Sequence, residues 1–267
     1  MNRITAQFQR LRQNKQKGFV VYIGAGDPSL ATTQELVVGM DKAGVDIVEL
    51  GVPFSDPLAD GLVNQLAAQR GLESGTTPKK LLEMIHGLRA ESQVPIVLYV
   101  YFNILHRYGI AKWITDCAAA GVDGLLVLDL PPEESDDYEA QMAKAGLSVI
   151  YLMAPTTTID RMELIAKRAS GFIYYVSREG VTGMQDQVAT NIGAMTARIR
   201  EHTDLPIAVG FGISNPEQAR YVASFAEAIV VGSAVVNQIA LHGKEPDLVD
   251  RVVKFVSPMV EAIKTNS

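Results

Sequence analysis

The stretch that decides the fold is "GVDIVELGVPFSDPLADG", residues 44–61. Its first half is an apolar run, which predicts a buried strand, yet this run ends on a carboxylate, Glu49. The chain then enters a loop that contains two prolines, Pro53 and Pro57, and two more aspartates, Asp56 and Asp60. The role of a charged residue at the end of a buried strand depends on where the fold places that strand end.

The same unit recurs along the chain: a helical stretch, a glycine or small residue, a short apolar strand and a polar loop. Gly44, Gly121 and Gly146 stand where the end of a helix favours a left-handed residue. The tetrapeptide A-G-V-D occurs at Ala43 and again at Ala120, which indicates a repeated β/α unit. Strands that are apolar on nearly every residue are typical of parallel strands covered on both faces. We expect strands at residues 19–24, 46–51, 96–102, 124–130, 148–154, 172–177, 207–212 and 228–232.

Eight β/α units in 267 residues predict an α/β protein with one (β/α)8 TIM barrel, a fold that typically takes about 250 residues. We expect a single domain over residues 1–267, and an open, doubly wound sheet is the alternative. Ile4, Phe8 and Leu11 recur at helical spacing before the first strand, which predicts an extra amphipathic helix that covers one end of the barrel. A transit peptide is the other interpretation of this basic segment.

The composition excludes several classes of protein. A net charge of −6 argues against a nucleic-acid partner, which requires a basic face. No apolar run approaches the roughly 20 residues of a membrane span. The one cysteine, Cys117, forms no internal disulfide and suits a reducing, cytoplasmic location. The four histidines are scattered without metal-ligand spacing, so we expect no metal site.

Active sites of such barrels lie at the carboxyl ends of the strands. "GFGIS" (210–214) and "VGSA" (231–234) follow the seventh and eighth strands. Glycine lets the backbone approach an anion, and the start of the next helix offers free N–H groups. We therefore predict that a phosphate of a small-molecule substrate lies against Gly210, Gly212, Gly232 and Ser233.

The carboxylates form the second part of the predicted site. Strand alternation puts Glu49 on the same face as Ile47, and if that face is the barrel interior, burial raises the pKa of Glu49 and prepares it for proton transfer. The alternative is a Glu49 that is paired with an Arg or Lys at the rim. Asp60 can reach the same substrate because the loop folds back over the barrel mouth. Asp56 stands in an S-D-P turn and is better explained by capping or an interface than by catalysis.

From Phe19 onward the chain resembles the alpha subunits of tryptophan synthase. The resemblance rests on "GDPS", "ELGVPFSDPLADG", "LDLPPEES", "YYVSREGVTG", "GFGIS" and "VGSA", in that order. It implies a lyase that cleaves indole-3-glycerol phosphate to indole and glyceraldehyde 3-phosphate in a retro-aldol reaction of L-tryptophan biosynthesis. It also implies a heterotetramer of two alpha and two beta subunits. Pyridoxal phosphate is then expected only in the beta subunit, which receives the indole, and this chain needs no cofactor.

The resemblance also implies roles for single residues. Glu49 matches the acid/base that protonates the indole ring, and Asp60 matches the acceptor of the indole N–H. The expected substrate-binding residues are Tyr101, Tyr174, Thr182, Gly183, Gly210, Gly212, Gly232 and Ser233. The expected partner interface consists of Pro53, Asp56, Pro57, Asn103 and Asp129, with Tyr101 beside it at the rim.

The chain departs from the family at four positions near the pocket: Tyr22, Gly24, Leu62 and Asn64. These departures bear on substrate affinity rather than on the reaction. Two other functions compete with the alpha-subunit interpretation. One is a free-standing lyase that releases indole, and the other is a non-catalytic regulatory subunit, which the presence of both carboxylates disfavours.

Overall fold

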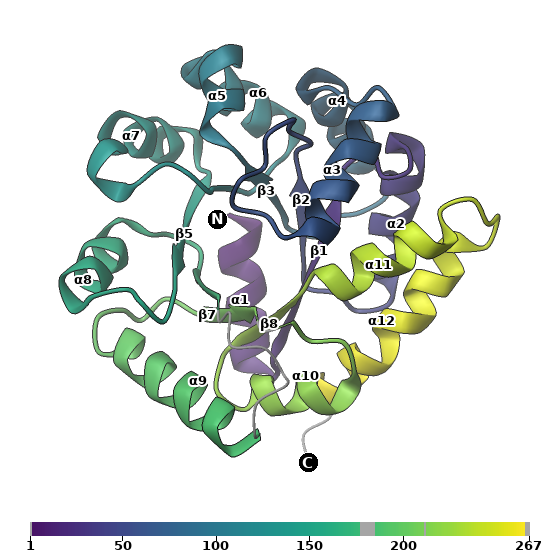
Figure 1. The fold of residues 1–267 in the computed structure, drawn as a ribbon. Coiled ribbons are helices and arrows are strands. Elements are labelled where there is room, and N and C mark those ends of the chain that lie inside the picture. Colours follow the sequence, from purple (N-terminus) through teal and green to yellow (C-terminus); the bar gives the residue numbers. More distant parts are fainter. Residues whose placement is uncertain (1, 177–184, 211, 265–267) are drawn as a thin grey trace.

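The computed structural model describes residues 2–176, 185–210 and 212–264, with the backbone alone at 185–191. Eight parallel strands follow one another around a closed barrel in chain order, and helices surround them (Figure 1). Because β1 also pairs with β8, Gly18 opposite Ala228, the sheet has no open edge. The predicted TIM barrel is confirmed, and the open-sheet alternative is wrong.

The observed strands agree with the eight predicted ones and are mostly shorter. They are β1 (Gly18–Gly24), β2 (Ile47–Gly51), β3 (Ile96–Val100), β4 (Gly124–Val127), β5 (Ser148–Met153), β6 (Ile173–Val176), β7 (Ile207–Gly210) and β8 (Ala228–Val231). The third strand ends before Tyr101 because the next backbone N–H, that of Phe102, donates to the carboxylate of Asp129 at 2.6 Å. Tyr101 and Asp129 therefore belong to the loops at the barrel mouth.

The helices begin and end at the residues that favour such ends. Ser29, Thr77 and Asn215 each accept a backbone N–H of the first helical turn. Gly121 and Gly146 end their helices at φ values of 91° and 71°, the left-handed region predicted for them. The helices are α1 (Arg3–Gln13), α2 (Leu30–Lys42), α3 (Leu62–Glu73), α4 (Pro78–Leu88), α5 (Phe102–Tyr108), α6 (Ile110–Ala120), α7 (Asp136–Ala145), α8 (Ile159–Arg168), α9 (Gln185–Arg200), α10 (Pro216–Ala223), α11 (Ser233–His242) and α12 (Leu248–Lys264), with a 3-10 turn at Pro132–Glu134.

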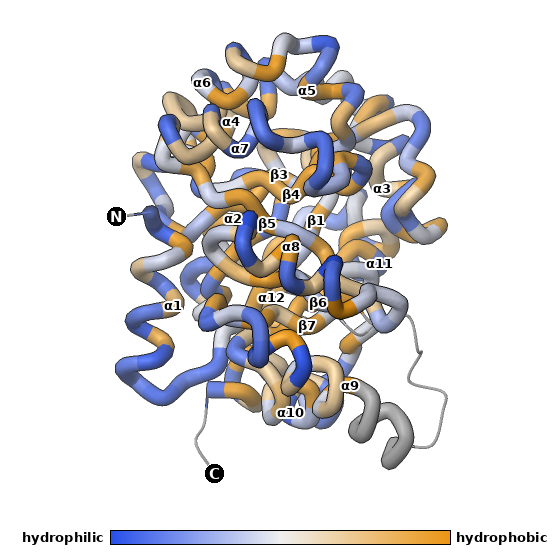
Figure 2. Tube along the Cα trace, turned by 90° about the vertical axis from the view of Figure 1, so that its left-hand side faces the viewer, coloured by the Kyte–Doolittle hydropathy of each residue, from blue (hydrophilic) through white to orange (hydrophobic). Residues whose placement is uncertain are grey.

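The first helix closes one end of the barrel, as the sequence predicts. Ile4, Phe8 and Leu11 are buried among the side chains that fill the barrel interior. The rings of Phe8 and Phe172 lie 5.8 Å apart. In the view of Figure 2, α1 lies along one side of the molecule while α3 and α11 lie toward the other. No helix within the described ranges is long and apolar enough to cross a membrane.

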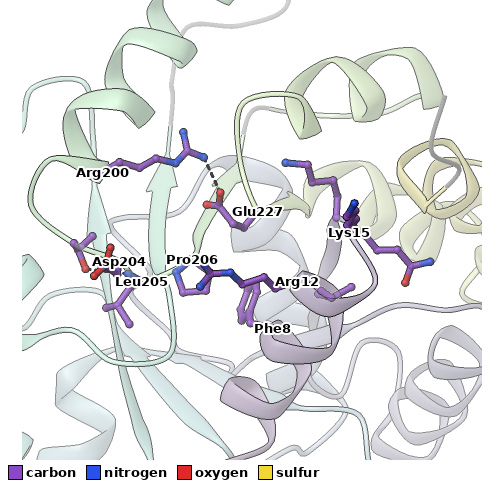
Figure 3. A pocket seen from close by; sticks show the side chains of 12 residues that line it. Phe8, Arg12, Lys15, Arg200, Asp204, Leu205, Pro206 and Glu227 are labelled. Atoms are coloured by element: carbon purple, nitrogen blue, oxygen red, sulfur yellow. Dashed lines mark hydrogen bonds and ion pairs between the residues drawn. The ribbon is translucent and has the colours of Figure 1, made fainter.

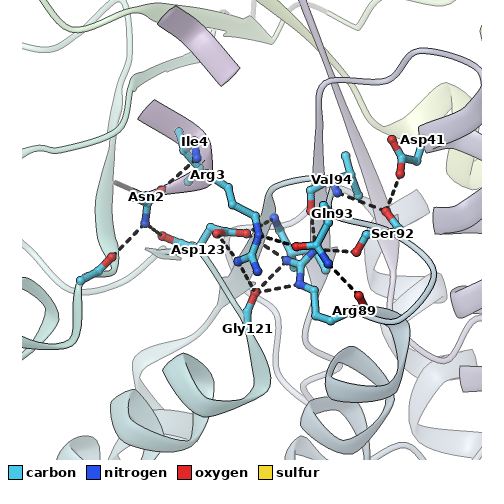
Figure 4. A network of polar contacts seen from close by, with 12 residues as sticks. Asn2, Arg3, Ile4, Asp41, Arg89, Ser92, Gln93, Val94, Gly121 and Asp123 are labelled. Atoms are coloured by element: carbon cyan, nitrogen blue, oxygen red, sulfur yellow. Dashed lines mark hydrogen bonds and ion pairs between the residues drawn. The ribbon is translucent and has the colours of Figure 1, made fainter. Parts of the chain in front are cut away.

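The aspartate of the repeated A-G-V-D tetrapeptide has the same structural role in both copies. Asp46 accepts the backbone N–H of Phe19 at 2.7 Å, and Asp123 accepts that of Ile96 at 2.9 Å. Each carboxylate thus fixes the start of the neighbouring strand. Asp123 is also paired with Arg3 and Arg89 in a network at the α1 end of the barrel (Figure 4). The amino ends of barrel strands contribute stability, and the opposite end is where the chemistry of this fold takes place.

Candidate active site

Glu49 points into the barrel interior. Its alternation partner Ile47 packs in the inner cluster, whereas Val48 and Leu50 pack in the outer layer between strands and helices. The side chain is fully buried, and neither carboxylate oxygen has a hydrogen-bond partner among the described residues. The alternative of a rim ion pair is therefore wrong within this part of the chain.

Burial raises the pKa of Glu49 to about 8, because the surroundings solvate the charged form poorly. No other group contributes to this change. At neutral pH the carboxyl group is therefore mostly protonated. A buried, protonated carboxylic acid with a pKa near the working pH is suited to donate a proton and take it back.

Asp60 is held above the barrel by two tyrosines of one strand end. The Tyr99 hydroxyl donates to Oδ1 of Asp60, and the Tyr101 hydroxyl donates to Oδ2, both at 2.8 Å. Tyr101 in turn accepts the backbone N–H of Ala59 at 3.0 Å, which ties the loop to the strand end. Tyr101 follows the last residue of β3 and keeps an extended backbone, with φ −90° and ψ 142°, so its side chain faces the same way as that of Tyr99 and both phenols reach one carboxylate.

The two carboxylates act on the same space. Burial raises the pKa of Tyr22, and the charges of Asp60 and then Glu49 raise it further. Burial also raises the pKa of Tyr174, followed in effect by the charge of Glu49, the neighbouring Tyr22 and the charge of Asp60. The Tyr22 ring meets the Tyr99 ring edge-on, with centroids 5.0 Å apart. Aromatic rings thus line the space between Glu49 and Asp60.

A cavity of about 400 Å³ connects these groups with the glycine loops. It is lined by Tyr22, Ala59, Asp60, Gly61, Asn64, Tyr99, Leu128, Leu152, Met153, Ala154, Thr157, Tyr174, Val176, Gly210, Gly212, Val230, Gly232 and Ser233. The structure therefore brings together Asp60, Tyr174 and the four residues predicted for phosphate. Glu49 lies next to this lining, since it pairs in register with Tyr22 across β1 and β2.

The glycine end of the cavity has the shape of an anion site. A Cβ on Gly210 would lie 3.2 Å from the ring of Tyr174, so a larger residue there would press on that ring. Gly212 has a φ of 65°, the left-handed region. Ser233 begins α11, so the free N–H groups and the positive dipole end of this helix lie beside the cavity.

The other predicted residues lie around this end of the barrel. Asp56 is exposed and accepts the Ser55 hydroxyl at 2.6 Å, outside the cavity lining. Asn103 and Asp129 are exposed, whereas Pro53 is buried against α3 beside Gly71. Pro57 is half-buried in the loop. Thr182 and Gly183 lie outside the described residues.

Sequence reasoning assigned no role to Tyr99, Tyr22 or Asn64, although Tyr22 and Asn64 stand out as unusual residues. Tyr99 precedes Tyr101 by two positions in "IVLYVYF". Strand periodicity could have identified Tyr99, because two extended residues that stand two positions apart point their side chains to the same side.

The volume of a cavity does not by itself identify the active site. A larger cavity of about 720 Å³ lies at the opposite end, between α1 and the segments before β7 and β8 (Figure 3). Arg200 and Glu227 form an ion pair of 2.8 Å there, and Lys17 donates to the carbonyl of Ala226. None of the predicted site residues that the structure describes lines this cavity.

Comparison with known proteins gives one consistent family. The family model described as "Tryptophan synthase alpha chain" matches residues 8–264. A protein of that name from Opitutus terrae is 51% identical over 92% of this chain and 93% of its own length. Another from Geotalea daltonii is 46% identical over 99% of this chain and 98% of its own length.

Solved structures agree over the whole length of the chain. Tryptophan synthase subunit alpha from Legionella pneumophila superposes with a TM-score of 0.91 at 36% identity, covering 98% of both chains. A chain of the ligand-free tryptophan synthase from M. tuberculosis superposes with a TM-score of 0.89 at 26% identity, covering 99% of this chain and 100% of that one.

Proposed function

The chain belongs to the tryptophan synthase alpha chain family, lyases that cleave indole-3-glycerol phosphate in tryptophan biosynthesis, and from this premise we propose that Glu49 and Asp60 perform the cleavage. The observation that carries the proposal is the pairing of two opposite environments at one cavity. Glu49 is buried without a hydrogen-bond partner among the described residues and is mostly protonated at neutral pH, while two phenols donate hydrogen bonds to the carboxylate of Asp60. One carboxyl group is prepared to give a proton and the other to stabilise positive charge.

The cavity suggests how the substrate lies. Its phosphate is placed at Gly212, Gly232 and Ser233, where backbone N–H groups bind an anion without a lysine. The indole ring lies toward Asp60, beside the ring of Tyr99, where flat aromatic surfaces pack well. This orientation puts the bond between ring and side chain near Glu49 and the ring nitrogen near Asp60. Thr182 and Gly183 are proposed to cover the bound substrate.

The reaction then needs only proton transfers and charge stabilisation by this chain. The carboxyl group of Glu49 gives its proton to the ring carbon that carries the glycerol chain, and positive charge develops on the ring nitrogen beside the Asp60 anion. The Glu49 carboxylate next removes the proton of the adjacent hydroxyl. The electrons of that O–H bond form the aldehyde carbonyl, the carbon–carbon bond breaks, and its electrons neutralise the ring. Indole and glyceraldehyde 3-phosphate leave, and Glu49 is protonated again.

The proposed partner is a pyridoxal-phosphate beta subunit, in a heterotetramer of two alpha and two beta chains. The names of the relatives, "alpha chain", support a complex with a beta chain. Asp56, Asn103 and Asp129 are exposed beside the mouth of the cavity, where a partner could receive indole. Pro53 and Pro57 stiffen the loop that connects this surface to Asp60. A cytoplasmic location is proposed for the complex, and no cofactor is assigned to this chain.

Indole release from indole-3-glycerol phosphate, measured with and without a beta subunit, tests this function. We expect indole from the isolated chain and much faster release in the complex. An equally fast isolated chain would favour the free-standing lyase instead. A chain that binds the substrate and never cleaves it, in either condition, would leave only the regulatory subunit.

A further inference from the structure

Asn64 holds an acceptor that nothing in the described residues satisfies. The residue is the third of α3 and lines the active-site cavity. Its carboxamide oxygen Oδ1 is buried and has no hydrogen-bond partner among the described residues. Its nitrogen Nδ2 lies 3.5 Å from Oδ1 of Asp60. The opposite amide orientation would place two oxygens against each other there, so the unpaired atom is the oxygen.

Close packing of α3 on β1 brings Asn64 to the cavity. A Cβ on Gly24 would lie 3.1 Å from the methyl group of Ala67. Ala67 is buried and stands three residues after Asn64, on the same helix face. Further along α3, a Cβ on Gly71 would lie 2.6 Å from the carbonyl oxygen of Ala25. Gly24 and Gly71 therefore let this helix lie where a larger residue would hold Asn64 away from the pocket.

An unpaired buried acceptor is unfavourable, and a ligand donor removes that penalty. The substrate of the proposed function carries one ring donor, the indole N–H, and this donor lies at Asp60. Asp60 Oδ1 already accepts the Tyr99 hydroxyl at 2.8 Å. Asn64 Oδ1, beside it, offers the N–H a second acceptor in a three-centre hydrogen bond.

We infer that Asn64 determines substrate specificity, because its Oδ1 accepts the indole N–H together with Oδ1 of Asp60. This inference rests on the proposed function and names the part of the substrate that the site recognises. The terminal amide torsion of asparagine is soft, so the oxygen turns toward the bound ring at little cost. The pocket thereby selects bicyclic aromatic rings that carry an N–H over rings of the same shape that lack it.

Binding of two matched, uncleavable phosphates tests the inference. The probes are 3-(indol-3-yl)propyl phosphate and its 1-benzothiophene counterpart, which has sulfur in place of N–H. Calorimetry on the alpha chain in complex with its beta subunit gives the ratio of the two affinities. In Asn64→Leu we expect this ratio to fall about fivefold, the value of one ordinary hydrogen bond, with little change for the benzothiophene probe.

Gln69→Leu is the matched control, since Gln69 is an exposed amide on the same helix that bonds only to Glu73. Its affinity ratio should equal that of the unaltered protein. Asn64→Ala is the second variant if Asn64→Leu fails to fold, and the same fall in the ratio is expected.

An unchanged ratio in the Asn64 variants, or an equal loss for both probes, would overturn the role of Asn64. The proposed cleavage by Glu49 and Asp60 would then still stand. If the unaltered protein binds neither phosphate, the proposed function falls, and the inference falls with it.

Discussion

Tyr99 donates its hydroxyl hydrogen to Oδ1 of Asp60 across 2.8 Å, from the strand next to the one that carries Glu49. This bond places the two carboxyl groups relative to each other, since β2 and β3 are hydrogen-bonded neighbours. The proposed proton donor, Glu49, and the proposed stabilising carboxylate, Asp60, are thus held by adjacent strands of the barrel, although Asp60 itself belongs to a loop. Such support is what keeps a catalytic group at its working position.

Tyr99→Phe should lower kcat/KM for indole-3-glycerol phosphate by roughly 10- to 100-fold. The change removes one hydrogen bond to a charged group, worth about 1.5–3 kcal/mol, while the ring stays in place. Steady-state kinetics in the presence of the beta subunit measure it. Tyr108→Phe is the control, because the Tyr108 hydroxyl bonds to Asp116 on the outer helices at 2.7 Å. Unchanged kcat/KM in Tyr99→Phe would show that Tyr101 alone positions Asp60.

Glu49→Gln should reduce kcat by roughly 10²- to 10⁴-fold, the usual contribution of general acid–base catalysis. Substrate binding should persist, because the amide has the same shape and removes no ion pair. Single-turnover indole release gives the rate, and calorimetry with an uncleavable phosphate gives the affinity. Near-normal turnover would remove Glu49 from proton transfer.

The pH dependence of the rate follows from the same group. The reactive form is the protonated acid, and the pKa of Glu49 is raised to about 8. The rate of the chemical step should therefore be level below that pH and fall tenfold per pH unit above it. A single-turnover profile between roughly pH 6 and 10 measures this. A rate that stays level past about pH 9 would contradict the assignment of Glu49 as the acid.

The stability of the fold should respond to the same titration. The pKa of Glu49 is about 8 in the folded chain and 4.5 as its ordinary value. Between pH 4.5 and about 8 the folded chain therefore keeps a proton on Glu49 that the unfolded chain releases. The contribution of Glu49 to the free energy of unfolding is fully present below pH 4.5 and is lost as the pH rises to about 8. Glu49→Gln should therefore gain a few kcal/mol over the unaltered protein on going from acidic to alkaline pH, as judged by denaturant unfolding. A constant difference between the two proteins would refute this linkage.

Gly51→Ala should destabilise the fold by about 1–3 kcal/mol, as overpacking does. A Cβ at residue 51 would lie 2.3 Å from the hydroxyl oxygen of Tyr22. Tyr22→Phe should recover part of the loss, since the ring carbon would still be 2.8 Å away. Gly87→Ala is the control, because apart from its chain neighbours and the backbone of its own helix no described atom lies within 4 Å of a Cβ there. Additive effects of the Gly51 and Tyr22 changes, in a double-mutant cycle of unfolding free energies, would show that the two residues do not compete for space.

Local pattern was enough for most of the architecture. The apolar runs located all eight strands, and helical spacing located the helix around Phe8, because burial on both faces leaves a direct mark in sequence. Strand ends were less exact. The carboxylate of Asp129 takes the N–H of Phe102 and ends the third strand early, and a contact across 27 positions has no local signature.

By itself, the sequence determined the eight strands, the shared facing of Ile47 and Glu49 and the glycine loops after the seventh and eighth strands, because strand alternation and turn chemistry are local. Closure of the barrel turned the face of Ile47 and Glu49 inward. Only the tertiary structure decided how the carboxylates are tuned. Three features arise only where strands and a helix meet across the barrel. Glu49 has no hydrogen-bond partner among the described residues, two phenols donate to Asp60, and the amide oxygen of Asn64 is unpaired among the described residues. Desolvation and hydrogen bonding depend on everything that surrounds an atom, and the surroundings exist only once the chain has closed.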